Sequence, residues 1–268
     1  MRTAYLGDEY SHSFAACKEF FCGETAGYRT VREVAAAVIS GECDECVLPA
    51  ENSVEGAVTA TEDVLVDFDL YIRSRIVLPI RHCLVALPGA KLLDIEKVYS
   101  HPQALAQCGK WLSENVPNAE RIPTLSTSYA LGLIENARQA AVAGSAKNGQ
   151  EIIARGIEDY KHNSTRFIRL SKELNDAGRR ASVVFGAENR PGGLLYVLKL
   201  FESARMNMTR IESRPSKAGL GDYIFFVDFV LPESNGDAAL KELLCSLRKN
   251  AASVKFLGRY DDINKAEA

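Results

Sequence analysis

The chain has 268 residues, with 32 lysines and arginines against 35 aspartates and glutamates, so its formal net charge is −3. This near balance argues against a main ligand that is a nucleic acid or an anionic membrane, because proteins that bind those carry a clear basic excess. Hydrophobic residues make up 47% and charged residues 25% of the chain. That composition is typical of a globular protein with its own core.

No targeting or membrane segment is evident. Charge appears at Asp8 and Glu9, before any apolar run of signal-peptide length. Arginines at positions 73, 75 and 81 interrupt the longest apolar stretch, 70–87, so we do not expect it to cross a membrane. We therefore expect a cytoplasmic protein.

The seven cysteines are odd in number and scattered, which favours reduced thiols over a disulfide framework. Cys43 and Cys46 have the spacing of half a zinc site, but no second pair completes a tetrahedral set. We expect a turn before a strand there, with Cys46 in the core, and no metal.

Strand and helix patterns alternate through the first two thirds of the chain, as in an α/β architecture. Strands are expected at 2–6, 45–48, 70–87 with a break at Pro79, 98–99, 140–143 and 165–170; helices are expected at 11–21, 30–40, 61–68, 102–114, 126–136 and 147–154. Two such lobes joined by long strands predict a central cleft, where small organic acids commonly bind.

A charged stretch without apolar periodicity, 172–180, predicts a domain boundary. Beyond it we expect strand 181–187, helix 193–203, strands 208–214 and 222–231, helix 237–250 and strand 254–257. This βαββαβ order is the ferredoxin-like plan. The predicted domains are 1–176 and 181–260.

The polar loop after the second predicted strand is the densest cluster of candidate ligand-binding groups. Glu51, Asn52 and Ser53 follow a buried strand and precede a helix, so free backbone N–H groups there can hold a carboxylate. Asn52 and Ser53 add neutral donors, which suit an anion better than Glu51 or Glu55. A capping turn with no ligand is the alternative.

A second cluster lies at another strand-to-helix junction. Ser100 ends a strand, and Gln103 and Gln107 are one turn apart on the following helix. Ser100 and Gln107 are therefore expected to reach one cleft. His101 is of a residue type suited to acid–base chemistry, but no carboxylate neighbours it in sequence, so it is a secondary candidate.

A third cluster of candidate ligand-binding residues lies at the start of the last predicted strand of the first region. Arg166 can bind a carboxylate through its planar fork or face solvent, and Ser126 and Thr127 either cap a helix or bind an anion.

The glycine-rich nucleotide loops and the nucleophile elbow are missing from the sequence. Phosphoryl transfer, hydride transfer and serine hydrolysis are therefore disfavoured.

Seven collinear motifs together resemble the prephenate dehydratase family with a C-terminal ACT regulatory domain. They are Tyr5-Leu6-Gly7, residues 49–56, His82-Cys83-Leu84, Ser100-His101-Pro102-Gln103 with Gln107-Cys108, Thr165-Arg166-Phe167, Pro191-Gly192-Gly193-Leu194 and Glu212-Ser213-Arg214-Pro215. The resemblance covers nearly the whole chain. It is specific because the order and spacing of all seven agree.

The resemblance implies a two-lobed, periplasmic-binding-protein-like catalytic domain with a central cleft, followed by a ferredoxin-like ACT domain. It implies conversion of prephenate to phenylpyruvate, water and CO₂ in phenylalanine biosynthesis, with no cofactor or metal. It further implies inhibition by L-phenylalanine and a homodimer or homotetramer. The dehydratase-like strand begins at the first residues, which is similar to the monofunctional type without a chorismate mutase extension.

Site residues follow from the resemblance by position in its motifs. Thr165 is implied to be essential, with Asn52, Ser100 and Gln107 as supporting catalytic residues. The implied substrate-binding residues are Glu51, Ser53, Ser126, Thr127, Arg166 and Phe167, and the implied effector-binding residues are Gly192, Gly193, Leu194, Glu212, Ser213, Arg214 and Pro215.

Two departures from the family pattern stand out. Gly7 is followed by Asp8, Glu9 and Tyr10, without the usual Pro and second Gly, and two carboxylates beside an anion site are expected to weaken binding or alter specificity. Gly193 replaces the usual Ala, a mild change expected to loosen the effector loop. The alternatives are arogenate dehydratase, with Asp8 or Glu9 against the substrate amine, and a non-catalytic small-molecule sensor.

Overall fold

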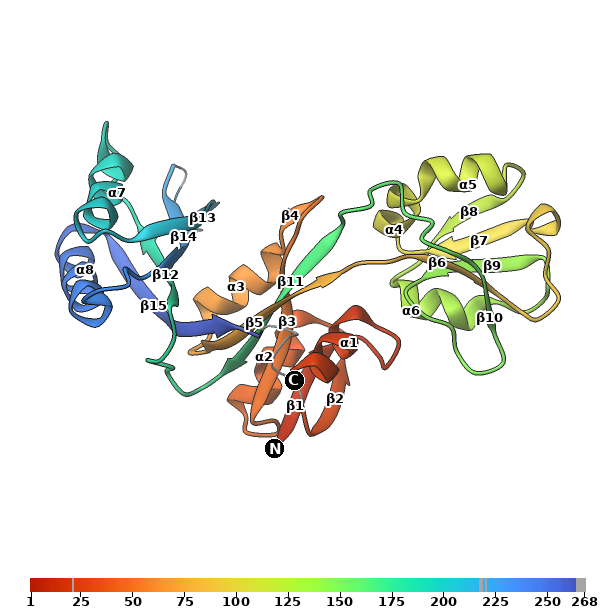
Figure 1. The fold of residues 1–268 in the computed structure, drawn as a ribbon, viewed down its shortest axis with the longest axis horizontal. Helices are drawn as coiled ribbons and strands as arrows, with labels where there is room; N and C mark the ends of the chain where they lie inside the picture. Colours follow the sequence, from red (N-terminus) through yellow and green to blue (C-terminus); the bar gives the residue numbers. More distant parts are fainter. Residues whose placement is uncertain (21, 217–218, 220, 264–268) are drawn as a thin grey trace.

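The protein forms three bodies in a row (Figure 1). The structure is a computed structural model that describes residues 1–20, 22–216, 219 and 221–263. A first lobe lies in the middle, a second lobe at one end and the C-terminal domain at the other, and the long strands β5 (Tyr71–Pro79) and β11 (Ser164–Ser171) lead from the first lobe to the second. The predicted α/β class with two lobes and a separate regulatory module is confirmed.

The first lobe combines parallel and antiparallel strands. It contains β1 (Arg2–Leu6), α1 (His12–Glu19), β2 (Glu24–Tyr28), α2 (Val31–Ile39), β3 (Glu45–Asn52), β4 (Gly56–Ala57) and α3 (Thr59–Asp67). Its strands run in the order β5-β11-β3-β1-β2; β1 is parallel to β2 and β3, and β11 is antiparallel to β3 and β5. The predicted capping box of Thr30 and Glu33 opens α2.

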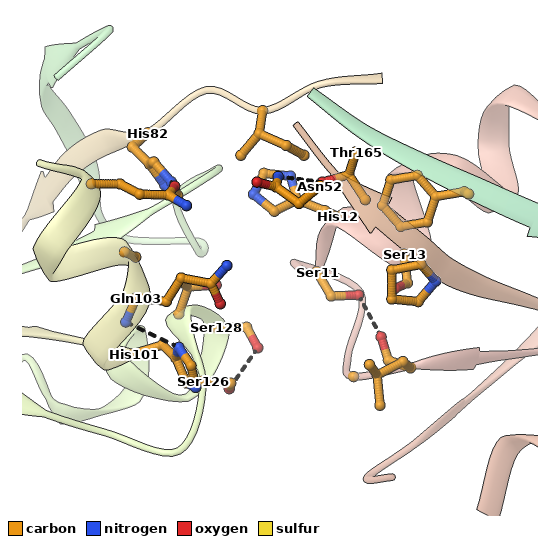
Figure 2. Close-up of a pocket in the computed structure, with 18 of the residues that line it drawn as sticks. Ser11, His12, Ser13, Asn52, His82, His101, Gln103, Ser126, Ser128 and Thr165 are labelled. Atoms are coloured by element: carbon orange, nitrogen blue, oxygen red, sulfur yellow. Dashed lines mark hydrogen bonds between the residues drawn. The ribbon is translucent and has the colours of Figure 1, made fainter. Parts of the chain in front are cut away.

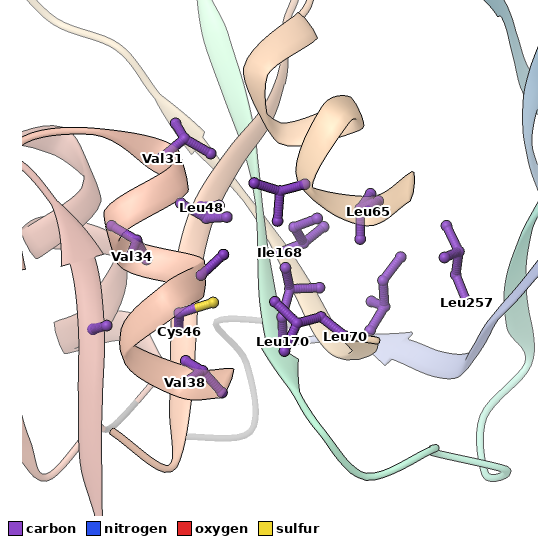
Figure 3. Close-up of a cluster of buried hydrophobic side chains, with 14 of the residues drawn as sticks. Val31, Val34, Val38, Cys46, Leu48, Leu65, Leu70, Ile168, Leu170 and Leu257 are labelled. Carbon is purple, nitrogen blue, oxygen red and sulfur yellow. The ribbon is translucent and has the colours of Figure 1, made fainter. Parts of the chain in front are cut away.

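Apolar residues of α2 recur at helical spacing and build the core of this lobe (Figure 3). Val34 and Val38 face Leu48 of β3 and Leu170 of β11, and all four are fully buried. Cys46 is also fully buried, as predicted, and all seven cysteines are free thiols. The packing fixes β3 and β11, the two strands that lead to the cavity described below.

The second lobe is a smaller sheet with short helices. It contains β6 (Cys83–Ala86), η1 (Leu92–Asp94), β7 (Lys97–Ser100), α4 (Pro102–Gln107), α5 (Gly109–Asn115), β8 (Glu120–Pro123), α6 (Thr127–Ala130), η2 (Leu131–Leu133), β9 (Gln139–Ala143) and β10 (Glu151–Arg155), in the order β10-β6-β9-β7-β8. Small residues in β9 allow close packing of the helices on the sheet.

Three helix predictions in this lobe need correction. The predicted helix 147–154 is a turn followed by strand β10, because Gln150 N–H bonds to the Lys147 carbonyl and Ile152 then pairs with Val85 of β6. The predicted helix 102–114 divides at Cys108 into α4 and α5. The predicted helix 126–136 stops after one turn of α6 and the short η2.

Several strands are longer or more numerous than expected. The strand predicted at 45–48 continues through Pro49 to Asn52, and Pro49 lies opposite Phe167 where the register with β11 shifts. A proline is tolerated at such an irregularity because it has no N–H to give to the ladder. Strands β2 and β8 were not expected, and Phe21, the predicted end of the first helix, lies outside the described residues.

The C-terminal module has the predicted βαββαβ order. It consists of β12 (Arg180–Gly186), α7 (Gly193–Ser203), β13 (Asn207–Pro215), β14 (Tyr223–Val230), α8 (Gly236–Asn250) and β15 (Ser253–Asp262), with its sheet in the antiparallel order β13-β14-β12-β15. The last strand is longer than predicted: Asp261 and Asp262 pair in parallel with Ser74 and Arg75 of β5. The sheet of the C-terminal module and the sheet of the first lobe therefore form one continuous sheet. Within the described ranges, no helix is long and apolar enough to cross a membrane.

Candidate active site

A cavity of about 290 Å³ lies between the two lobes (Figure 2). The first lobe lines it with Leu6, Gly7, Ser11, His12, Ser13, Pro49, Asn52, Thr165 and Phe167; the second lobe and its connection line it with Ile80, His82, His101, Gln103, Ala104, Gln107, Leu125, Ser126, Thr127 and Ser128. Among the described residues that line it there is no lysine, arginine, aspartate or glutamate. The cavity is thus rich in hydroxyl, amide and imidazole groups.

Strand pairing brings the two central residues together. Asn52 ends β3 and Thr165 lies at the start of β11, and the two are direct partners in the antiparallel ladder. Side chains alternate along a strand, so Thr165 and Phe167 face the cavity while Arg166 faces away. Residues 113 apart in sequence are thereby in hydrogen-bond contact.

A chain of amide hydrogen bonds, buried except at its exposed end Glu55, runs from Thr165 to the second lobe. The Asn52 amide Nδ2 donates to Thr165 Oγ1 (2.9 Å) and to Asn163 Oδ1 (2.8 Å). Asn163 Nδ2 donates to Gln107 Oε1 (2.8 Å), and Gln107 Nε2 donates to Glu55 Oε1 (2.9 Å). The structure therefore places three of the four expected catalytic residues, Thr165, Asn52 and Gln107, in one network. Their catalytic role stays a prediction.

Ser100, the fourth, does not reach the cavity. Its side chain is fully buried and its hydroxyl donates to the Val142 carbonyl (2.6 Å) on the neighbouring strand β9. The expectation that Ser100 and Gln107 share one cleft is wrong for Ser100. The reason is that Ser100 is still within β7, where its side chain points into the lobe.

The six expected substrate-binding residues divide into two groups. Ser126, Thr127 and Phe167 line the cavity, and Ser126 also caps α6 by accepting from Tyr129 N–H (3.0 Å). Ser53 lies outside the lining and instead holds backbone, since its hydroxyl donates to the His162 carbonyl (3.2 Å) and accepts from Ser164 N–H (3.0 Å).

Glu51 and Arg166 point away from the cavity and correct the prediction. Their carboxylate and guanidinium are 3.0 Å apart, and Arg166 also pairs with Asp228 of the C-terminal domain at 3.0 Å. The alternation of side chains along β3 and β11 explains this, because Asn52 and Thr165 occupy the opposite face. Both residues belong to the contact between domains.

Two histidines of the cavity had no role in the sequence prediction. Burial and the neighbouring His82 lower the pKa of His12 to about 4, and burial lowers the pKa of His82 despite its bond to Gln107. Their rings meet edge to face, with centroids 6.1 Å apart. Both imidazoles are therefore neutral at pH 7. His101, the secondary candidate, lines the cavity and caps α4, accepting from Gln103 N–H (3.3 Å).

The altered loop after Gly7 does not place charge at the cavity. Asp8 uses its carboxylate to accept from Tyr10 N–H (3.0 Å), and its carbonyl accepts from Ser11 N–H (3.0 Å). Neither Asp8 nor Glu9 lines the cavity. Gly7 has a left-handed φ of 93°, which turns the chain directly into α1. The expected carboxylates beside the anion site are thus turned outward.

The strand that leads to the first expected effector motif ends on the same side of the C-terminal sheet as the second motif, since Gly186 and Arg214 both pair with Ile224. Gly192 caps α7 with a left-handed φ of 78°. A Cβ at Gly193 would lie 2.1 Å from the Glu188 carbonyl oxygen. The glycine is therefore required by this backbone rather than being a mild change.

Arg214, one of the expected effector-binding residues, contacts the first lobe. It pairs with Asp63 (3.1 Å) and Glu62 (3.3 Å) of α3 in the first lobe. On β13, Arg210, Glu212 and Arg214 share one face, and this face is the half-buried one. Arg214 is consequently engaged with the first lobe in this structure, whereas Ser213 and Pro215 are exposed.

A two-lobed α/β domain with a polar cavity between its lobes, followed by a ferredoxin-like domain, defines a small-molecule-binding protein with an attached regulatory module. Residues 3–175 match the family model "Prephenate dehydratase", and residues 181–244 match the model "ACT domain". The chain belongs to the prephenate dehydratase family.

Curated relatives match nearly the whole of this chain. A bifunctional chorismate mutase/prephenate dehydratase of Aquifex aeolicus is 38% identical over 272 residues, covering 97% of this chain and 73% of that protein. A prephenate dehydratase of Lactococcus lactis subsp. lactis is 36% identical over 274 residues, covering 97% of both.

Two solved structures have the same overall fold as this chain. Prephenate dehydratase of Arthrobacter aurescens in complex with L-Phe has a TM-score of 0.89 at 32% identity, covering 99% of this chain and 91% of that one. A second structure, titled GqqA, a novel type of quorum quenching acylase, has a TM-score of 0.85 at 27% identity and covers 100% of both chains. One architecture thus carries two named activities.

Proposed function

We propose that this protein converts prephenate to phenylpyruvate, CO₂ and water, and that L-phenylalanine bound at the ACT domain controls the rate. The observation that carries the proposal is the Asn52–Thr165 contact in the cavity between the lobes. Thr165 Oγ1 accepts a hydrogen bond from Asn52, so its own proton remains to be donated toward the cavity.

The reaction needs a donor at the leaving hydroxyl. The bond from the ring to one carboxylate breaks and releases CO₂, the electron pair enters the ring as it becomes aromatic, and the ring C–O bond breaks to release hydroxide, which takes a proton from solvent. Thr165 is too weak an acid to transfer its proton fully, but its O–H stabilises the developing negative charge on the departing oxygen.

The neutral lining suits a carboxylate that has to leave as CO₂. Ser126, Thr127 and Gln103 line the cavity from the second lobe and offer hydroxyl and amide donors. Such groups orient carboxylates, whereas a full positive charge would hold the departing one in its ionised form. Phe167 gives the ring an apolar wall.

Arogenate is the competing substrate, and its amine calls for a carboxylate. Asp8 and Glu9 were the candidates, and both lie outside the lining residues. This favours prephenate. An acylase would instead need an activated nucleophile, and in the described part of the chain no imidazole is hydrogen-bonded to a hydroxyl. A sensor without chemistry is disfavoured by the intact Asn52–Thr165 pair.

The setting follows from the biosynthetic role. We place the protein in the cytoplasm, acting without cofactor on free prephenate, as a homodimer or homotetramer with the effector motifs around Gly192 and Ser213. Size-exclusion chromatography with light scattering, with and without L-phenylalanine, measures the assembly.

The decisive experiment incubates the purified protein with prephenate and follows phenylpyruvate by its alkaline absorbance, with and without L-phenylalanine. Arogenate is the parallel substrate. Thr165→Val removes the donor and is expected to lower kcat about 100-fold or more, whereas Thr165→Ser keeps the hydroxyl and much of the activity. Wild-type turnover by a folded Thr165→Val protein, or binding of prephenate without CO₂ release by the wild type, contradicts the proposal.

A further inference from the structure

The hydrogen bonds around Thr165 have a direction that can be read from their two ends. Asn52 Oδ1 accepts from the backbone N–H groups of Val54 (3.0 Å) and Glu55 (3.3 Å). Because those groups only donate, the other end of the amide must be the NH₂ that faces Thr165 and Asn163. The orientation of Asn52 is fixed by backbone.

The far end is fixed by a carboxylate. Glu55 can only accept, so Gln107 must present its NH₂ to Glu55 (2.9 Å) and its oxygen to Asn163 Nδ2 (2.8 Å). The same oxygen meets His82 Nε2 at 3.0 Å, and that nitrogen then carries the ring proton. Two amide orientations are thereby set from opposite ends.

Asn163 is the link on which both ends converge. It is 2% exposed, its oxygen accepts from Asn52 (2.8 Å) and its NH₂ donates to Gln107. An amide, like a protonated acid of the same shape, offers an acceptor on one side and a donor on the other, whereas a carboxylate offers acceptors alone. A reversed amide at Asn163 would put two donors against each other at Asn52.

We propose that Asn163 and Glu55 are positioning residues for Thr165: the backbone sets which way the Asn52 amide faces, and Asn163 and Glu55 hold the rest of the network so that Asn52 stays in place to donate to Thr165, which directs its own proton to the substrate. This rests on the proposed function. The proposal also concerns the two lobes. Gln107 belongs to the second lobe and Glu55 to the first, so this series of hydrogen bonds is complete only when the lobes are in contact.

The test uses Asn163→Asp, an isosteric change that replaces the donor with a second acceptor. At pH 7.5 we expect kcat to fall about 30- to 100-fold, with KM within about threefold. On acidification the aspartate gains a proton and regains the donor, so the ratio of wild-type to variant kcat is expected to shrink at least about fivefold by pH 5. Asn163→Leu loses activity without this rescue.

The ratio isolates the substituted side chain. Ionisable groups around the network are common to the wild type and both variants: Glu55, His82, His12, Glu158, Arg81 and His162. Asn115→Asp is the matched control, because Asn115 donates its amide to the Trp111 carbonyl on α5 (2.9 Å) and lies outside the cavity lining. It should leave kcat and its pH profile unchanged.

Substitutions of Glu55 provide a second test of the proposal. Glu55→Gln keeps an acceptor for Gln107 and is expected to lower kcat no more than about threefold, whereas Glu55→Ala releases Gln107 and lowers it about tenfold. Equal activity of Glu55→Ala and the wild type overturns the proposal, as does an Asn163→Asp protein that lacks the acid rescue.

Failure of the proposed function shows separately. If the wild type does not convert prephenate, that function fails, and the direction of the network is then tested by the ¹⁵N spectrum of the side-chain amides. Slowly exchanging NH₂ pairs for Asn52, Asn163 and Gln107, with those of Asn52 and Gln107 shifted in Asn163→Asp, support the inference. Rapid exchange of the Asn163 pair overturns it.

Discussion

The two faces of the paired strands β3 and β11 carry opposite chemistries. On the cavity face, Asn52 and Thr165 are neutral partners at 2.9 Å. On the other face, Glu51 and Arg166, one residue away on each strand, form an ion pair at 3.0 Å that extends to Asp228 of the C-terminal domain. Charge thus joins the domains, while directed neutral donors are kept for a substrate that has to lose a carboxylate.

The charged face also reaches the end of the C-terminal sheet where the expected effector motifs lie. Arg210 pairs with Glu62 at 2.6 Å, and Arg214 contacts Glu62 at 3.3 Å. Arg75 pairs with Asp262 where β15 joins β5. Of the strands that hold Asn52 and Thr165, both contact the regulatory domain through the ion pairs of Glu51, Arg166 and Asp228.

Among substitutions on the cavity face, Asn52→Asp is expected to lower activity most. A carboxylate cannot donate to Thr165 or Asn163, and it places negative charge beside a dianionic substrate, so kcat/KM is expected to fall about 1,000-fold. Steady-state kinetics with prephenate measure the loss, and circular dichroism confirms the fold. A loss under about tenfold would show that the Asn52 donor is dispensable.

The charged face should respond in stability rather than chemistry. Arg166→Met leaves Glu51 and Asp228 without their shared guanidinium, and we expect the free energy of unfolding to fall by about 2–4 kcal/mol. Urea titration measures it. The control is Arg32→Met, because the Arg32–Asp67 pair is exposed (68% and 41%) and should contribute less than about 1 kcal/mol. Equal losses in the two variants would contradict the comparison.

Gly193→Ala tests the effector end. The added Cβ meets the Glu188 carbonyl oxygen at 2.1 Å, so α7 has to shift, at a cost of about 1–3 kcal/mol. Inhibition by L-phenylalanine is expected to weaken, with turnover in its absence retained. In Gly132→Ala the nearest contact is Lys147 Nζ at 3.9 Å, and stability should change by less than about 0.5 kcal/mol. Unaltered inhibition in a stable Gly193→Ala protein would refute the requirement.

The smallest effect concerns pH and the neutral cavity. Burial and His82 lower the pKa of His12 to about 4 from its ordinary 6.5, so between these values the unfolded chain binds the proton more readily. Stability is therefore lost as pH falls from 6.5 toward 4. His12→Gln should reduce the loss between pH 7 and pH 5 by about 1–2 kcal/mol, measured by thermal melting. His162→Gln, at an exposed position, should leave the pH dependence intact.

Local sequence signals were sufficient for much of the fold. The capping box at Thr30 and the glycine start of α7 at Gly193 were predicted at their residues, because capping geometry is written in neighbouring side chains. The segment 147–154 was misread, because its strand exists through pairing with β6, a partner more than 60 residues away.

The same distinction between local signals and long-range contacts holds for the candidate site. The motifs identified Thr165, Asn52 and Gln107, and their order along the chain identified the family. They gave no role to His12, His82 or Asn163, although Ser11-His12 and Asn163-Ser164-Thr165 stand beside residues already singled out. A family motif does not show which face of a strand each side chain occupies, and for this reason Arg166 and Glu51, which lie on the reverse face of β11 and β3, are predicted wrongly as substrate-binding residues.

By itself the sequence determined most of the helices and strands, which family the motifs resemble and which polar residues gather at the strand ends, because these depend on short-range patterns. Only the tertiary structure decided which side of a strand each side chain occupies relative to the other domain. It also decided the direction of the amide chain from Glu55 to Thr165, because that direction depends on partners up to 113 residues apart.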